Sequence, residues 1–223
     1  LASPLVVPIL DNDDAVIHLR LGDGLYSSVG TNEEKGVFPH KTYINLLMQA
    51  QQEKGTISSI CIVTAPFKGS NVRSFDVGYT SLSEEIALDL LNALQNAFPK
   101  AKISIHNSPE ETIMESLARV VHARKVAVCG CSTFCPYPLL ATEGIGFMYN
   151  PVGAQNQWVR NAAKRYDDFR LFETPMLNGL MISNEKTGWR LDHALVIDWV
   201  RNQDPNVGNV DIIEAPIFRE PKP

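Results

Sequence analysis

Short apolar runs alternate along this chain with segments of helical periodicity, and this alternation limits the possible folds more than any other feature. Continuous apolar runs are typical of strands that are covered on both faces. Strands are predicted over 15–19, 59–64, 102–106, 126–129 and 145–149, and helices over 39–54, 83–98, 109–122 and 136–142. Strands that alternate with helices predict an α/β fold, here a Rossmann-like doubly wound parallel sheet.

The pattern loosens beyond residue 150. Helices are predicted over 155–164 and 189–202, and the residues from 165 to 187 are expected to be irregular. A chain of 223 residues with 44% hydrophobic content can form about one full core. We therefore expect residues 1–150 to form the ligand-binding domain and residues 151–223 to form a helical, less regular extension packed on it.

Charge and motif content exclude several classes of function. The formal net charge is −5, without the basic excess of a nucleic-acid-binding surface. No apolar run reaches the roughly 18 residues of a membrane span. The phosphate-binding motif G-x-x-x-x-G-K-[ST] is absent, no G-x-G-x-x-G follows the first strand, and there is no G-x-S-x-G. A P-loop nucleotidase, an NAD or FAD enzyme and an α/β-hydrolase are thus not expected.

Charged residues follow the first predicted strand in the stretch His18-Leu19-Arg20-Leu21-Gly22-Asp23. Ligands of open α/β sheets bind beyond the carboxyl ends of the strands. The guanidinium of Arg20 offers five donors in a fixed geometry that suits phosphate or carboxylate. Alternatively, Arg20 forms a surface or interdomain salt bridge, and His18 is a packed, hydrogen-bonded core residue.

A second candidate anion site is the turn from Gly130 to Phe134, where the fourth strand leads into a helix. Backbone N–H groups at such a turn lack partners, and the helix dipole favours negative charge. Ser132 and Thr133 add hydroxyl donors, although Ser132 is equally interpreted as an ordinary helix cap. Together with Arg20, this turn is predicted to hold a diphosphate.

Three of the four cysteines, Cys129, Cys131 and Cys135, lie in the heptapeptide C-G-C-S-T-F-C, and Cys61 lies in the second strand. A metal site needs further ligands at a recognisable spacing, and none follows. We interpret the cysteines as small buried residues. A disulfide such as Cys131–Cys135, a metal site, and a nucleophilic Cys131 beside His18 are the alternatives.

Two stretches of the sequence resemble a known family. Residues 16–23, V-I-H-L-R-L-G-D, resemble the H-x-R-x-G-D motif of the fucosyltransferase superfamily, which covers α1,2-, α1,6- and protein O-fucosyltransferases. Residues 108–134 are similar to the second shared region of that superfamily, in which a helix and a strand lead into a Ser-Ser/Thr-Phe turn. The resemblance covers about residues 13–150 and keeps the order and separation of the two regions.

The resemblance implies the donor-binding half of a GT-B fold that uses GDP-fucose without a metal or other cofactor. Arg20 and His18 would be the catalytic residues, with Arg20 on the β-phosphate and His18 shaping the nucleotide site. Gly22 and Asp23 would complete that end of the site. The turn at Ser132, Thr133 and Phe134 would hold the diphosphate, and Asn107 or Glu111 would read the guanine. Glu111 is equally predicted to form a helix capping box with Ser108.

The departures from the family pattern point to a second interpretation. Leu21 stands where many members have a second Arg, and Cys135-Pro136-Tyr137-Pro138 replaces an aromatic-rich continuation. The resemblance also implies an acceptor-side domain ahead of the motif, which these residues do not include. The expected partners are a nucleotide-sugar donor, a glycan or protein acceptor, and that domain or a partner chain. The compartment would be the Golgi or ER lumen for a eukaryotic secretory-pathway enzyme. The alternative is an inactive glycosyltransferase-like domain with a structural or interaction role.

Overall fold

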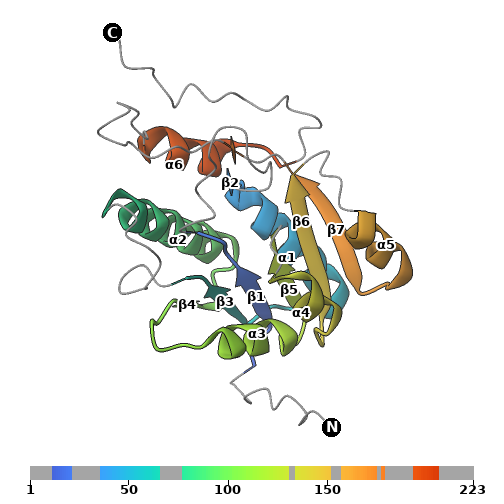
Figure 1. Cartoon of the computed structure of the whole chain (residues 1–223). Helices are drawn as coiled ribbons and strands as arrows, with labels where there is room; N and C mark the ends of the chain where they lie inside the picture. Colours follow the sequence, from blue (N-terminus) through green and yellow to red (C-terminus); the bar gives the residue numbers. More distant parts are fainter. Residues whose placement is uncertain are drawn as a thin grey trace.

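A six-stranded, all-parallel sheet forms the centre of the molecule in a computed structural model of the chain (Figure 1). The structure describes residues 12–21, 36–65, 77–130, 134–151, 157–174, 177–178 and 193–205. The strands of the sheet are β1 (Ala15–His18), β3 (Ser59–Val63), β4 (Lys102–His106), β5 (Val126–Cys129), β6 (Ile145–Pro151) and β7 (Phe169–Thr174). The predicted α/β, Rossmann-like doubly wound fold is confirmed.

The strand order across the sheet is β4-β3-β1-β5-β6-β7. The chain first winds outward from β1 through β3 to β4, then crosses back and winds the other way through β5, β6 and β7. Right-handed crossovers place the helices of the two halves on opposite faces of the sheet. The order reverses between β1 and β5, and doubly wound sheets bind their ligands at such a switch point, beyond the carboxyl ends of the strands.

Helices cover both faces of the sheet (Figure 1). One face packs against α1 (His40–Lys54), α2 (Val77–Ala97) and α6 (His193–Asn202). The other packs against α3 (Ile113–Val121), α4 (Pro136–Leu140) and α5 (Gln157–Arg165). Among the described residues, no helix is both long and apolar enough to cross a membrane.

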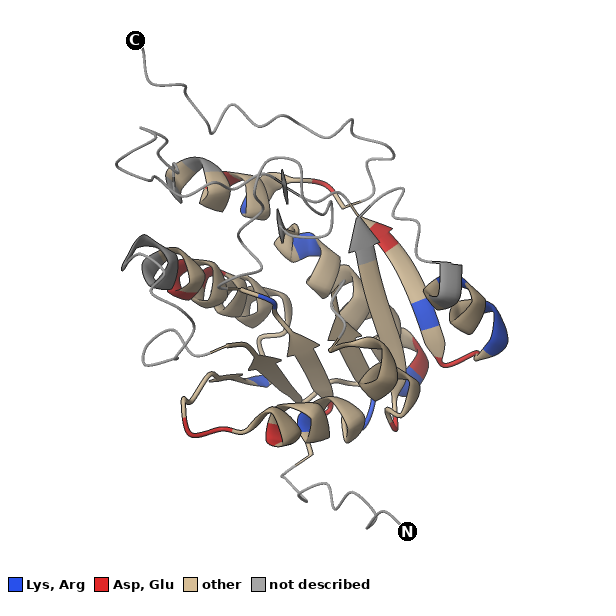
Figure 2. Ribbon diagram, in the orientation of Figure 1, with Lys and Arg blue, Asp and Glu red and all other residues tan. Residues whose placement is uncertain are grey.

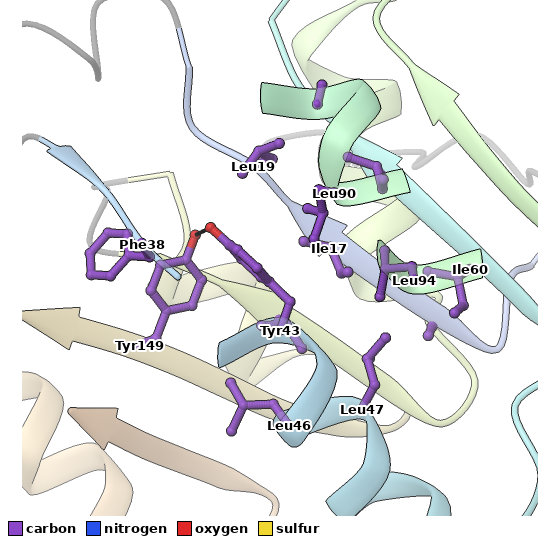
Figure 3. Packing of buried hydrophobic residues seen from close by; sticks show 14 of the residues in the cluster. Ile17, Leu19, Phe38, Tyr43, Leu46, Leu47, Ile60, Leu90, Leu94 and Tyr149 are labelled. Carbon is purple, nitrogen blue, oxygen red and sulfur yellow. Dashed lines mark hydrogen bonds between the residues drawn. The ribbon is translucent and has the colours of Figure 1, made fainter. Parts of the chain in front are cut away.

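Alternate residues of each strand enter the two cores, as the pleat of a strand requires. Ala15 and Ile17 of β1 face the first helix layer, where Tyr43, Leu46 and Leu47 pack (Figure 3). Val16 faces the second layer instead. The inner strands β1, β3, β5 and β6 carry no Lys, Arg, Asp or Glu, and the charges lie on helices, connections and outer strands (Figure 2). Burial on both faces of the sheet thus explains why the inner strands are so apolar.

The described parts of the helices differ from the prediction at two starts. Helix α2 begins at Val77, six residues before the start of the helix predicted over 83–98. Helix α3 begins at Ile113, not at 109, and its capping box is formed by Thr112 and Glu115. The predicted capping role of Ser108 and Glu111 is therefore wrong. The Ser108 hydroxyl instead accepts a hydrogen bond from the Glu110 N–H, 3.2 Å away.

Residues beyond 150 contribute to the sheet. Strand β7 pairs with β6 in parallel from Gly146↔Phe169 to Pro151↔Thr174. The expectation that 165–187 is irregular is therefore wrong over β7, whereas the predicted helix near 155–164 is confirmed as α5. A separate antiparallel pair joins β2 (Gly36–Val37) to β8 (Leu177–Asn178).

A buried carboxylate organises the amino-terminal edge of the sheet. Asp14 is 3% exposed, and its Oδ2 accepts hydrogen bonds from the Ser58 N–H at 2.8 Å and the Ser58 hydroxyl at 2.5 Å. Arg124 and Lys125 form ion pairs with the same carboxylate. The hydrogen bonds and the two cations outweigh burial and lower the pKa of Asp14. The segments before β1, β3 and β5 are thereby tied together, opposite to the predicted ligand edge.

Candidate functional site at the carboxyl ends of β1 and β5

The stretch that starts with His18-Leu19-Arg20 begins at the end of β1, which lies between β3 and β5 in the sheet. The Leu19 N–H donates to the Val63 carbonyl at 2.8 Å and so extends the pairing of β1 with β3 by one residue. Leu19 and Leu21 are buried, whereas His18 and Arg20 are half-buried. Two apolar side chains therefore anchor the backbone that carries the two polar ones.

His18 directly contacts Phe134, the last residue of the predicted anion-binding turn. Its imidazole stacks on the ring of Phe134, with centroids 4.5 Å apart and planes inclined by 19°. Phe134 follows β5 in the chain, and β5 pairs with β1 from Ala15↔Val126 to His18↔Cys129. The structure thus brings His18 and Phe134 together at the switch point of the sheet.

The imidazole of His18 is neutral at physiological pH. Burial disfavours its charged form, and the positive charge of Arg20 acts in the same direction, so the pKa of His18 is lowered from 6.5 to about 4. Any positive charge that this end of β1 offers to an anion therefore comes from Arg20 and not from His18.

A disulfide between Cys129 and Cys135 closes the turn after β5, with Cα atoms 5.6 Å apart. Both cysteines are buried, as interpreted, but they are bonded to each other, and the pairing differs from the alternative Cys131–Cys135. Cys61 is free and buried, as expected, and burial raises the pKa of its thiol to about 12. The Sγ atom of Cys135 lies 3.5 Å from Nδ1 of His18.

A pair of buried tyrosines, Tyr43 and Tyr149, lies next to the ends of β1 and β5 (Figure 3). The hydroxyls of Tyr43 and Tyr149 are 3.0 Å apart, and the Tyr149 hydroxyl donates to the His18 carbonyl at 3.5 Å. Gly130 lies against the Tyr149 ring so closely that a Cβ at this position would come within 2.6 Å of it. The sequence did not point to these tyrosines, since aromatic residues in a strand and a helix are ordinary core residues.

The residues predicted to read the guanine follow β4 at the same edge of the sheet. Asn107 comes directly after the strand and is half-buried. The Glu111 carboxylate accepts hydrogen bonds from Arg119 Nε at 3.1 Å and Ser116 Oγ at 3.3 Å, and lies 3.5 Å from His106 Nδ1. Glu111 is therefore engaged within the protein, whereas Asn107 has no such set of bonds to the described residues. Gly22, Asp23, Ser132 and Thr133 lie outside the described residues, as does Cys131.

A second buried histidine, His40, links three helices. Its Nε2 lies 3.0 Å from Asp89 Oδ2, and Arg201 also pairs with Asp89, so α1, α2 and α6 are joined. Burial lowers the pKa of His40 to about 4, although Asp89 acts against this shift. No sequence pattern pointed to this cluster, because its members come from three separate helices.

The fold and this geometry define an α/β protein whose two motif segments meet at a topological switch point. No protein-family model matches the sequence, and a search of curated proteins finds no significant match. An Arg beside a neutral His, at the carboxyl end of a parallel strand, is suited to binding an anionic ligand without proton transfer.

Proposed function

We propose that this chain is the donor-binding domain of a glycosyltransferase, which holds GDP-fucose for fucosyl transfer to a glycan or protein hydroxyl. The observation that carries the proposal is the stacking of His18 on Phe134. These residues belong to the two separate stretches that resemble the fucosyltransferase superfamily, and they meet where doubly wound sheets bind ligands.

Arg20 is the proposed phosphate ligand. It lies two residues beyond the end of β1, on a backbone held by the buried Leu19 and Leu21. Its positive charge acts on His18, and the pKa of His18 is lowered in part for this reason. Because the imidazole of His18 is neutral, Arg20 is the group at this strand end that would contribute positive charge to the binding of a diphosphate.

In the proposed reaction, the acceptor hydroxyl attacks the anomeric carbon of the sugar. The bond from that carbon to the β-phosphate oxygen breaks, and its electron pair leaves with GDP. Negative charge grows on the departing phosphate, and a fixed guanidinium stabilises it more in the transition state than in the bound donor. The general base that takes the hydroxyl proton would come from the acceptor side.

Base recognition is assigned to Asn107 rather than to Glu111. Both follow β4 at the ligand edge, but the Glu111 carboxylate already accepts hydrogen bonds from Arg119 and Ser116. An amide offers both a donor and an acceptor to the edge of a base.

Calorimetric titration of the chain with GDP, beside UDP and ADP, tests the proposal. GDP is expected to bind most tightly, and Arg20→Ala to weaken binding about 10- to 100-fold, the range of a charge-assisted hydrogen bond. Lys102→Ala is the matched control, because it removes one exposed positive charge at the start of β4. Equal weakening by both variants would show non-specific attraction and contradict the assignment of Arg20.

A second candidate function is an inactive, glycosyltransferase-like domain with a structural or interaction role. The favouring observation is that Leu21, which stands where many superfamily members have a second Arg, is only 3% exposed. A core residue there contributes no charge to a phosphate site. Absence of binding of all three nucleotides to the folded chain would support this candidate over the first.

A further inference from the structure

Three side chains with metal-binding atoms converge at the switch point of the sheet. The ring nitrogens of His18 and the sulfurs of Cys129 and Cys135 supply ligand atoms that all lie within 4.8 Å of one another. They come from the end of β1, the end of β5 and the residue before α4. Both cysteines are fully buried, and among the described residues this is the one such cluster of three or more.

The separation of one sulfur from the imidazole nitrogen matches a tetrahedral metal centre. Zinc bonds of about 2.3 Å to sulfur and 2.0–2.1 Å to nitrogen, at a tetrahedral angle, place the two donors roughly 3.5 Å apart. The distance from Cys135 Sγ to His18 Nδ1 is 3.5 Å. The stack on Phe134 orients the imidazole, which would otherwise lose rotational freedom on binding a metal.

We propose that, once the disulfide is reduced, His18, Cys129 and Cys135 bind a thiophilic divalent cation such as Zn²⁺. A dithiol or phosphine reductant supplies two electrons, and two thiols replace the S–S bond. Cation binding then releases two protons, so that two thiolates and the neutral Nδ1 become ligands. The two negative charges offset the charge of the cation, which suits a buried site.

Little movement of the backbone is required. Two thiolates on one zinc ion lie roughly 3.8 Å apart by the same bond lengths. The Cα atoms of Cys129 and Cys135 are 5.6 Å apart, so rotation about the Cα–Cβ bonds is sufficient to separate the sulfurs. The disulfide and the cation exclude each other, since each uses both sulfurs. The inference does not depend on nucleotide binding.

Titration of the chain with Co²⁺, as a spectroscopic substitute for Zn²⁺, tests the inference. Protein reduced with a phosphine is expected to develop the thiolate-to-cobalt charge-transfer band and the intense visible bands of a four-coordinate site, at one equivalent. Addition of Zn²⁺ should abolish them, and oxidised protein should show none. A reduced, folded chain without these bands would overturn the inference.

Variants identify the ligands. Cys135→Ser and His18→Ala are each expected to weaken Co²⁺ binding at least about 10-fold, as even the loss of an outer-shell partner does. Cys61→Ser and Cys131→Ser serve as controls and should leave the bands unchanged. A band that persists in the Cys129→Ser/Cys135→Ser double variant, or that is lost in either control, would assign the metal to other residues and overturn the inference.

A measurement on the unaltered chain keeps the test independent of how the variants fold. In reduced protein, Zn²⁺ should protect two thiols from a thiol-specific reagent, and tryptic peptide mapping should locate them at Cys129 and Cys135. Protection of any other pair, or of none, would contradict the proposed site.

Discussion

The imidazole of His18 lies nearly parallel to the ring of Phe134, with centroids 4.5 Å apart, and this contact joins the end of β1 to the turn after β5. It links the two halves of the doubly wound sheet at the predicted ligand edge. The contact therefore connects Phe134 to the end of the strand that precedes Arg20.

Phe134→Leu is expected to lower the free energy of unfolding by about 1 kcal/mol, the usual contribution of an aromatic pair beyond its buried area. A double-mutant cycle with His18→Ala, measured by urea unfolding, should give a coupling energy of roughly 0.5–1.5 kcal/mol. Phe172→Leu on β7 is the comparison and should show no coupling to His18. Equal coupling for both would mean that the stack has no specific effect.

Gly130→Ala should destabilise the fold by about 1–3 kcal/mol, because its Cβ would come within 2.6 Å of the buried Tyr149 ring. The cost should fall markedly in a Tyr149→Leu background, since a shorter side chain frees the space. Gly55→Ala has no atom within 4 Å of its Cβ, and its cost of about 1 kcal/mol or more comes from a φ of 83°. That cost should be the same in both backgrounds. Thermal and urea unfolding of the single and double variants would measure these differences.

Reduction of the Cys129–Cys135 disulfide should lower the free energy of unfolding by about 2 kcal/mol in the absence of metal. The bridge spans a sequence separation of six residues, and closing so short a loop restricts the unfolded chain only modestly. The midpoint of urea unfolding, measured with and without reductant, provides the test. The Cys129→Ala/Cys135→Ala variant should be insensitive to the reductant, and a shift in that variant would place the redox effect elsewhere.

The free energy of unfolding should decrease as the pH falls from 6.5 towards 4. The pKa values of His18 and His40 are about 4 in the folded protein, against 6.5 for an ordinary histidine. In this range the unfolded chain takes up protons that the folded protein does not, so acid favours unfolding, by at most about 3 kcal/mol for each imidazole. His40→Asn should flatten the profile between pH 7 and 5, and the partly exposed His122 provides the control variant His122→Asn. An unchanged slope in His40→Asn would contradict the assignment.

The sheet could be predicted from the sequence because its inner strands are buried on both faces. Apolar runs such as 60–63 and 126–129 are too short for core helices and are typical of buried strands, and the structure places them in β3 and β5. The start of α2 was less predictable, since Gly78 and Thr80 are weak helix formers and obscure the first turn. Strand β7 was missed because Arg170 and Glu173 interrupt its apolar residues.

The candidate site was only partly predictable. Position at a strand end was sufficient to single out His18, Arg20 and Phe134, since the carboxyl ends of parallel strands lie at one edge. The pairing of the cysteines could not be predicted, because three cysteines within one heptapeptide allow several different disulfides. The structure pairs Cys129 with Cys135, whose Cα atoms are 5.6 Å apart, a separation that is usual for a disulfide. Similarly, nothing in the sequence indicated that Arg119 engages Glu111.

The parallel pairing of β6 with β7, which continues to Pro151↔Thr174, determines how the chain can be divided. A fragment that ends at residue 150 would turn β6 into an edge strand, with a row of unsatisfied N–H and C=O groups beside the apolar residues Ile145, Phe147 and Met148. Such an edge is a template for intermolecular strand addition, so this fragment should be prone to aggregation. Fragments intended for ligand-binding work should therefore retain β7.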